Sequence, residues 1–289
     1  MRGLQDRICC GLEKLDGKAT FREDQWQRED GGGGRTRIIR AGNLFEKGGV
    51  NFSEVHGEVT ETMKANTEVE ADHFFATGVS IVLHPNNPNV PIIHMNVRYF
   101  ELSDGTYWFG GGIDLTPHYV DAAFAGIFHR RLKSICDEFH PTFYDRFKKW
   151  ADDYFFLPHR DETRGVGGIF FDHLSATKEV SKEQLLHFCM KLGDSFVDIY
   201  DEQSREKRDL TCSPHQYSWM NLRRGRYVEF NLVHDRGTKF GLVSGGRTES
   251  ILMSLPANAS WEYDHQPEPD SEEERTLELL RKGIDWVSE

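Results

Sequence analysis

The sequence predicts an α+β fold with one mainly antiparallel β-sheet covered by helices. A block of strand-like runs joined by short turns containing proline or glycine favours antiparallel pairing. A helical block follows, and further strand-like runs and a helix close the chain, an order typical of α+β proteins. Because no repeat or linker interrupts it, we expect a single domain over residues 1–289.

The region up to about residue 66 is rich in glycine and charge and has few long periodic runs. No Gly-Lys-Ser/Thr follows the glycine tract at residues 31–34, so the tract is not a P-loop. A flexible loop and a lid at the edge of a substrate site both fit it. The first strands are expected after this region, at residues 79–83, 92–101 and 107–109.

Helical patterns follow the strands. Two segments have apolar residues at mixed spacings of three and four, and a third is strongly amphipathic. Ser181 and Gln184 fit a capping box at the start of the third. We expect these helices at residues 119–139, 143–156 and 181–205, with a short strand at 169–171 between them.

The last part of the chain returns to strand character. We predict strands at residues 227–233, 240–243 and 251–255, where β-branched and aromatic residues gather. A closing helix is expected over residues 272–287, with Leu277, Leu280 and Ile284 facing inward.

Composition limits the possible partners and locations. The net charge of −12 disfavours nucleic acid and anionic membrane surfaces. No run approaches the roughly 18 apolar residues of a membrane span. The N-terminus lacks the pattern of a secretory or transit signal, so we expect a cytoplasmic protein unless a targeting segment was trimmed. Five cysteines without C-x-x-C spacing predict reduced thiols, mostly in the core.

The predicted strand at residues 92–101 places His94, Asn96 and Arg98 on one face, because side chains alternate along a strand. A proton carrier, an amide and a fixed cation in a row fit a binding wall for a polar, anionic molecule. A solvated face of a half-exposed sheet fits equally well.

A glycine tract follows at residues 110–112, where we expect a turn that lets a ligand approach the backbone closely. Asp114 comes next, flanked by apolar residues. Such a carboxylate is either catalytic or the cap of a helix that begins near Pro117.

Arginines beside glycines recur in this acidic chain. Arginine pairs with carboxylates through a planar fork, and neighbouring glycines expose backbone N–H groups. Each pair by itself also fits a turn with a solvated cation. The candidates are at residues 35–37, 160–164, 223–226, 236 and 247.

These motifs together resemble oxygen-dependent coproporphyrinogen III oxidase. HMNVRYFE at residues 94–101 and WFGGGIDLTP at residues 108–117 carry the resemblance most clearly. Further matching runs lie at residues 21–26, 31–35, 46–53, 77–80, 83–88, 148–155, 164–172, 223–232, 235–241 and 245–256. The sequence departs from the family at His234, where aromatic residues are common, and at Gly49, where alanine is.

The resemblance implies a large antiparallel sheet sandwiched between helical layers. It also implies oxidative decarboxylation of two propionates of coproporphyrinogen III to vinyl groups, giving protoporphyrinogen IX. O2 is the oxidant and no organic cofactor is needed. Asp114 would contact pyrrole N–H groups, and His94 would act as acid or base. The implied substrate-binding residues are Ser80, Asn96, Val97, Arg98, Arg164, Gly245, Gly246 and Arg247.

Two further sets of residues follow from the resemblance. His84, His94, His129 and His159 match positions proposed as metal ligands, but none has tight ligand spacing, so a divalent metal is possible and not favoured. Tyr227, Glu229, Asn231 and Val233, on one face of their predicted strand, would lie at a homodimer contact. Two alternatives remain: a non-catalytic tetrapyrrole carrier and a His-dependent metal oxygenase acting on another polycarboxylate.

Overall fold

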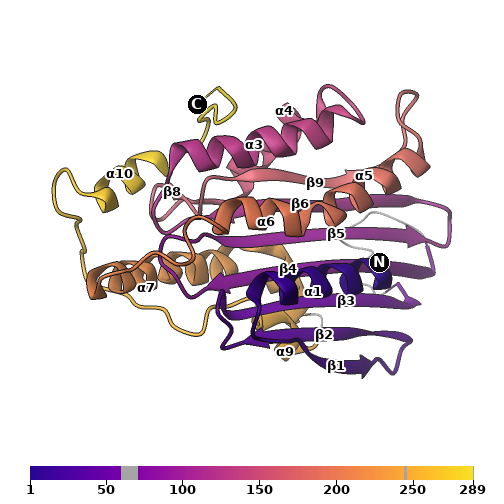
Figure 1. Cartoon of the computed structure of the whole chain (residues 1–289). Helices are drawn as coiled ribbons and strands as arrows, with labels where there is room; N and C mark the ends of the chain where they lie inside the picture. The colour runs from indigo at the N-terminus through magenta and orange to yellow at the C-terminus, as the bar shows by residue number, and fades with distance from the viewer. Residues whose placement is uncertain (60–70, 244–245, 289) are drawn as a thin grey trace.

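One antiparallel sheet carries the fold in the computed structural model, which describes residues 1–59, 71–243 and 246–288 (Figure 1). Its seven strands lie in the order β1-β2-β3-β4-β5-β6-β9, so that only β9 joins out of sequence. The strands of this sheet are β1 (Arg22–Gln27), β2 (Gly32–Arg40), β3 (Phe45–Glu58), β4 (His73–Pro85), β5 (Ile92–Leu102), β6 (Tyr107–Thr116) and β9 (Gly168–Leu174). A small hairpin is formed by β7 (Phe156–Leu157) and β8 (Glu162–Thr163).

Helices cover both faces of the sheet. On the first face, α1 (Arg2–Asp16), α5 (Lys182–Asp194) and α6 (Phe196–Ser204) lie over the sheet and run roughly along the strands (Figure 1). Beside them, α3 (Ala122–Asp137) and α4 (Phe143–Tyr154) pack against β9. The main apolar core lies between these helices and the sheet and includes Ile81, Met95, Phe171 and Phe188. The remaining helical elements are α7 (Pro214–Glu229), the π-helical turn η1 (Phe230–His234), α8 (Arg236–Val243), α9 (Thr248–Leu252) and α10 (Glu272–Leu279).

The segment around α9 covers the second face of the sheet through polar contacts. Asn51 Nδ2 donates to the carbonyl of Ser250 at 2.7 Å, and Lys47 Nζ donates to the carbonyl of Leu255 at 2.6 Å. Met253 packs directly over Gly49, where a Cβ would lie 1.9 Å from its sulfur. The α+β fold with an antiparallel sheet between helical layers is therefore confirmed.

The N-terminal region is more regular than its sequence suggested. The tract at residues 31–34 is neither a loop nor a lid, because Gly32 already begins β2. Trp26 of β1 lies against Gly34, where a Cβ would approach its ring to 2.5 Å, so glycine makes room for the indole. β3 pairs with β4, and β2 and β1 add to it in turn. Pairing thus makes strands of segments that have little β-propensity of their own.

The turn expected at residues 110–112 is also wrong. These glycines lie inside β6, opposite residues 96–98 of β5. They serve close approach instead of a turn: a Cβ on Gly110 would lie 2.7 Å from the Arg98 guanidinium, and one on Gly111 would lie 2.9 Å from Phe171.

The strands predicted at residues 227–233, 240–243 and 251–255 are wrong as well, since this part of the chain is helical. Tyr227 and Asn231 are both buried, and the Asn231 amide donates to the Tyr227 carbonyl one turn earlier. Short apolar runs fit either period, and tertiary burial decided between them. A signal for the helix was present: Ser213 and Gln216 form a capping box before α7.

Other helix predictions are confirmed in existence and differ in extent. Ser181 caps α5 through the predicted capping box, but the predicted helix at residues 181–205 divides at Ser195 into α5 and α6. The closing helix ends at Leu279 instead of continuing to residue 287, and Gly283 beyond it has a positive φ of 82°.

The five cysteines are free thiols. Cys9, Cys136 and Cys189 are buried in the core as expected, whereas Cys10 is exposed and Cys212 half-buried. Among the described residues, no helix is long and apolar enough to cross a membrane.

Candidate functional site

The predicted polar row on β5 is confirmed as one face of the strand. His94, Asn96 and Arg98 are half-buried, whereas the alternating Ile93 and Met95 are fully buried in the core on the other side. Val97, expected to contact substrate, also lies on the core side and is 0% exposed. Across the sheet, Ser80 of β4 stands opposite Asn96. The row thus lies half-buried on the second face of the sheet, away from the main apolar core.

Asp114 joins the end of this row. It stands directly opposite His94 in the β5–β6 pair, and its Oδ1 lies 2.6 Å from His94 Nδ1. Its Oδ2 accepts a hydrogen bond from Arg164 Nη2. The Asp114 side chain is 3% exposed and that of His94 is 23% exposed, so the imidazole is the accessible end of this series of hydrogen-bonded side chains. Burial acts to raise the pKa of Asp114, but the charges of Arg164 and His94 outweigh it and lower that pKa.

Arg164 is enclosed instead of facing an open anion site. Its guanidinium carbon lies 4.3 Å from the ring centroid of Phe155, 4.7 Å from that of Tyr227 and 4.6 Å from that of Phe230. Burial acts to lower its pKa, but the charge of Asp114 more than compensates and raises it. The geometry makes Arg164 a permanent cation that keeps Asp114 ionised.

The backbone around Arg164 explains how it reaches β6. The Leu115 N–H donates to the Gly167 carbonyl at 3.0 Å, and the Val166 N–H donates to the Leu115 carbonyl at 3.0 Å. Gly167 has a φ of 73°, a conformation that residues with a Cβ rarely adopt. This turn brings residues 164–168 against β6, and Arg164 thereby meets Asp114.

Arg98 and Arg247, the other predicted carboxylate-binding arginines, each bind an aspartate of this chain. Arg98 Nη2 lies 2.8 Å from Asp172 Oδ2, and Arg247 Nη2 donates to Asp24 Oδ2 at 2.5 Å. Gly246 is exposed and its N–H donates to the Gly241 carbonyl, whereas Gly245 lies outside the described residues.

Sequence reasoning missed Asp24 and Asp172 as partners of these arginines. Asp172 follows Phe171 in β9, whose alternation with buried residues offered a signal. Nothing in the pattern links either aspartate to an arginine far along the chain.

The four candidate metal-binding histidines have separate partners. His84 Nε2 donates to the Ser254 carbonyl, His129 bonds to Tyr144 and the Val166 carbonyl, and His159 bonds to Glu229. Burial lowers the pKa of His129 to about 3. No three metal-donor side chains gather anywhere in the described residues.

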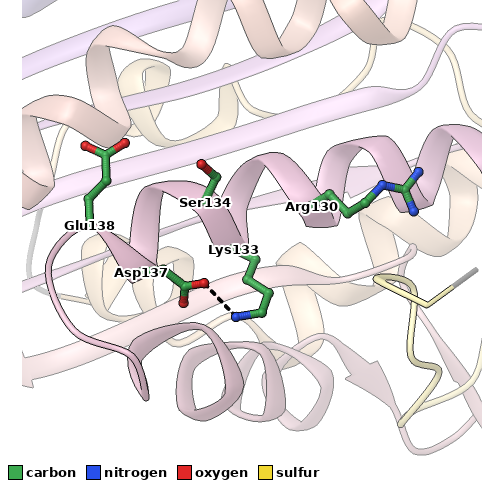
Figure 2. Close-up of a pocket in the computed structure, with 5 residues that line it drawn as sticks. All are labelled: Arg130, Lys133, Ser134, Asp137 and Glu138. Carbon is green, nitrogen blue, oxygen red and sulfur yellow. Dashed lines mark hydrogen bonds and ion pairs between the residues drawn. The ribbon is translucent and has the colours of Figure 1, made fainter.

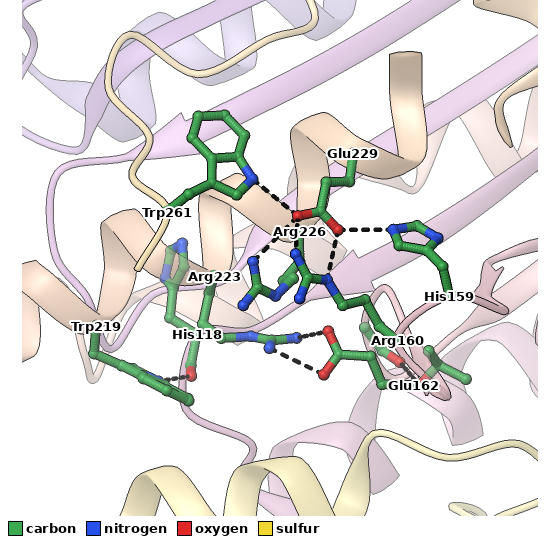
Figure 3. A network of polar contacts seen from close by, with 11 residues as sticks. His118, His159, Arg160, Glu162, Trp219, Arg223, Arg226, Glu229 and Trp261 are labelled. Carbon is green, nitrogen blue, oxygen red and sulfur yellow. Dashed lines mark hydrogen bonds and ion pairs between the residues drawn. The ribbon is translucent and has the colours of Figure 1, made fainter. Parts of the chain in front are cut away.

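The residues expected at a homodimer contact lie at the end of α7 and in η1. Tyr227 and Asn231 are buried within the single chain, whereas Val233 is 50% exposed. Glu229 lies at the centre of a polar network (Figure 3). It accepts hydrogen bonds from Arg160, His159, Trp261 and Arg226. Although burial opposes it, this set of donors lowers the pKa of Glu229 to about 2, and the network ties α7 to the hairpin of β7 and β8.

A shallow surface depression lies elsewhere, along the outer side of α3 (Figure 2). Arg130, Lys133, Ser134, Asp137 and Glu138 line it, and Lys133 pairs with Asp137 across it. None of the predicted site residues contributes to this depression.

Comparison with known proteins agrees with the resemblance seen in the sequence. The family model described as coproporphyrinogen III oxidase matches residues 1–286. The chain is 47% identical over 302 residues to the oxygen-dependent coproporphyrinogen-III oxidase, chloroplastic, of Glycine max, covering 99% of this chain and 78% of that protein.

Two other relatives are similar. Coproporphyrinogen-III oxidase 1, chloroplastic, of Arabidopsis thaliana is 46% identical, with coverage of 99% and 78%. The oxygen-dependent coproporphyrinogen-III oxidase of Prochlorococcus marinus is 45% identical, with coverage of 100% and 91%. This chain therefore belongs to the coproporphyrinogen III oxidase family.

Proposed function

We propose that this chain catalyses the oxygen-dependent oxidative decarboxylation of coproporphyrinogen III to protoporphyrinogen IX in haem and porphyrin biosynthesis. In each reacting arm, a propionic acid group and one O2 give a vinyl group, CO2 and H2O2. The arm loses two electrons and two protons to O2 as the carboxyl carbon leaves. In this family member, the observation that supports the proposal best is the hydrogen-bonded series His94–Asp114–Arg164 at one end of the polar row, which is buried except for the imidazole.

In this proposal, His94 transfers the proton and Asp114 orients the His94 imidazole. When His94 Nδ1–H donates to Asp114, Nε2 is the ring atom left to exchange a proton with substrate. Arg164 keeps Asp114 ionised, so that Asp114 can accept the hydrogen bond that orients the imidazole. Asp114 also stays a candidate for the pyrrole N–H contact, through lone pairs that His94 and Arg164 do not use.

The propionates would be held by arginines of the same face. Arg98 and Arg247 are each about a third exposed, so their forks are within reach of a substrate carboxylate. Ser80 and Asn96 would add neutral hydrogen bonds, and a contact from Gly245 and Gly246 stays a prediction from the resemblance. Because the protein is strongly acidic overall, this local positive charge is what would attract an anionic substrate.

The test is O2 consumption by purified, chelator-treated protein given coproporphyrinogen III, with products identified by chromatography after oxidation to porphyrins. We expect protoporphyrin and O2 uptake without added metal. Turnover that returns only with a divalent metal would support the metal oxygenase chemistry instead. Binding of the porphyrinogen without turnover under either condition would support a carrier.

We also propose that the protein forms a homodimer through the region of η1, where Leu232 and Val233 are 45% and 50% exposed. Sedimentation of the purified chain tests this. A cytoplasmic location stays a prediction from the sequence, and two of the relatives carry the word chloroplastic in their names.

A further inference from the structure

An irregular step in β9 brings two consecutive side chains to the face of the sheet that carries the polar row. The pairing of β6 with β9 changes register between Phe109 and Gly111, the pattern of a β-bulge. His173, in this step, has a φ of 47°, which is uncommon for a residue with a Cβ. Asp172 therefore contacts Arg98 while His173 stacks on Trp108.

Ring stacking fixes the His173 side of this bulge, and the contacts of Asp172 fix the other side. The His173 ring lies 4.7 Å from the Trp108 ring at an interplanar angle of 28°. Trp108 in turn stacks on Phe100 at 4.4 Å, and Phe100 stacks on Phe74 at 5.8 Å. Four rings thus form a continuous stack across β4, β5, β6 and β9, which gives the strained residue a rigid support.

The Asp172 carboxylate has a defined orientation as a result. Its Oδ1 accepts a hydrogen bond from the His173 N–H at 2.9 Å, within the bulge itself. Its Oδ2 is left to bind Arg98 Nη2 at 2.8 Å. The bulge thus directs one carboxylate oxygen at the guanidinium.

The Arg98 guanidinium is held from two further sides. Its Nη1 donates to Asn96 Oδ1 at 3.1 Å, and the group lies over Gly110, where a Cβ would come within 2.7 Å of it. The side chains of Arg98 and Asp172 remain 35% and 27% exposed. A guanidinium has five N–H donors, and the contacts of Arg98 with Asn96 and Asp172 leave some of them for a ligand.

We infer that Asp172 is a positioning residue that holds the Arg98 fork over Gly110 so that Arg98 receives one propionate carboxylate of the tetrapyrrole. The inference rests on the proposed function, because it takes that substrate as the source of the carboxylate. Asp172 acts through Arg98 and has no part in proton transfer. Its loss should therefore weaken binding and leave the chemical step intact.

A double-mutant cycle tests this coupling, with coproporphyrin III as a non-reacting probe whose binding is followed by fluorescence. We expect Asp172→Asn to weaken binding about fivefold and to raise KM similarly, with kcat nearly unchanged. In an Arg98→Ala background, Asp172→Asn should have no further effect. Asp194→Asn is the matched control, because Asp194 also pairs with an arginine, Arg7, but on the first face of the sheet.

A second variant covers the case in which the Asp172 variants fold poorly. Gly110→Ala should displace the fork and weaken probe binding while Asp172 stays in place. Wild-type or tighter binding by Asp172→Asn or Gly110→Ala would overturn the inference. So would losses that simply multiply in the double variant.

Failure of the proposed function gives a different result. A wild-type protein that binds coproporphyrin III with this coupling, but does not convert coproporphyrinogen III, would leave the inference standing and remove the proposed reaction. A wild-type protein that does not bind the probe would overturn the inference.

Discussion

Asp114 and Arg164 form an ion pair in which neither side chain is more than 3% exposed. Three aromatic rings surround the guanidinium. The carboxylate also bonds to His94, whose side chain is partly exposed. Two buried charges in such surroundings depend on each other, because either one alone would lack the hydration that water supplies in the unfolded chain. The pair is therefore a structural unit as well as part of the candidate site.

Asp114→Ala should destabilise the protein by about 3–5 kcal/mol, because it leaves the Arg164 charge buried without its partner. Asp114→Asn should cost less, since the amide retains an oxygen acceptor. Urea unfolding of the two variants and the wild type measures the difference. Equal stability of Asp114→Ala and wild type would mean that the pair contributes little.

His94→Gln should lower kcat by about 10²–10⁴-fold if His94 transfers a proton. The partly exposed imidazole fills no core position, so the unfolding midpoint should change little. Steady-state O2 uptake with coproporphyrinogen III measures kcat. A variant with normal turnover would transfer the acid–base role to another group.

Arg247→Gln should raise KM by about tenfold through loss of a charge-assisted contact to a propionate. The variant also breaks the ion pair with Asp24 that joins the segment before α9 to β1. Asp24→Asn separates the two effects, because it breaks the same ion pair but keeps the guanidinium. Equal increases in KM for both variants would assign the effect to the ion pair and not to substrate binding.

His129 should make stability depend on pH between about 6.5 and 3. Burial lowers its pKa from 6.5 to about 3, so the unfolded chain takes up a proton in this range while the folded protein does not. Above pH 6.5 the His129 ring is neutral in both states, so the free energy of unfolding has its full value. As the pH falls from 6.5 toward 3, the free energy of unfolding decreases by up to about 1.4 kcal/mol per pH unit.

Thermal unfolding at pH 7.0 and 5.5 tests this dependence. His129→Gln should be less sensitive to the change in pH than the wild type. His187→Gln, at an exposed position of α5, is the control and should behave as the wild type does. Identical sensitivity of all three proteins would contradict the prediction.

Some features of the site were predictable from local sequence. Strand alternation places His94, Asn96 and Arg98 on one face whatever the sheet around them does. The capping box at Ser181 fixes the start of α5 in the same local way. Family motifs then pointed to Asp114, although not to its burial.

Other features were not predictable because they depend on contacts between distant residues. The run at residues 227–233 fits a strand and a helix equally, and burial of Tyr227 and Asn231 on one side of the chain makes it helical. The glycines at residues 110–112 suggested a turn, but their small size instead makes room for Arg98 and Phe171.

The sequence by itself determined the antiparallel strand with its polar row, the charge balance and the family. Each follows from backbone period, composition or motif, which are local properties. Only the tertiary structure decided that Arg164 belongs to Asp114 and Arg98 to Asp172. Ion pairs form between side chains that the fold brings within a few ångströms, and no local pattern records which distant carboxylate that will be.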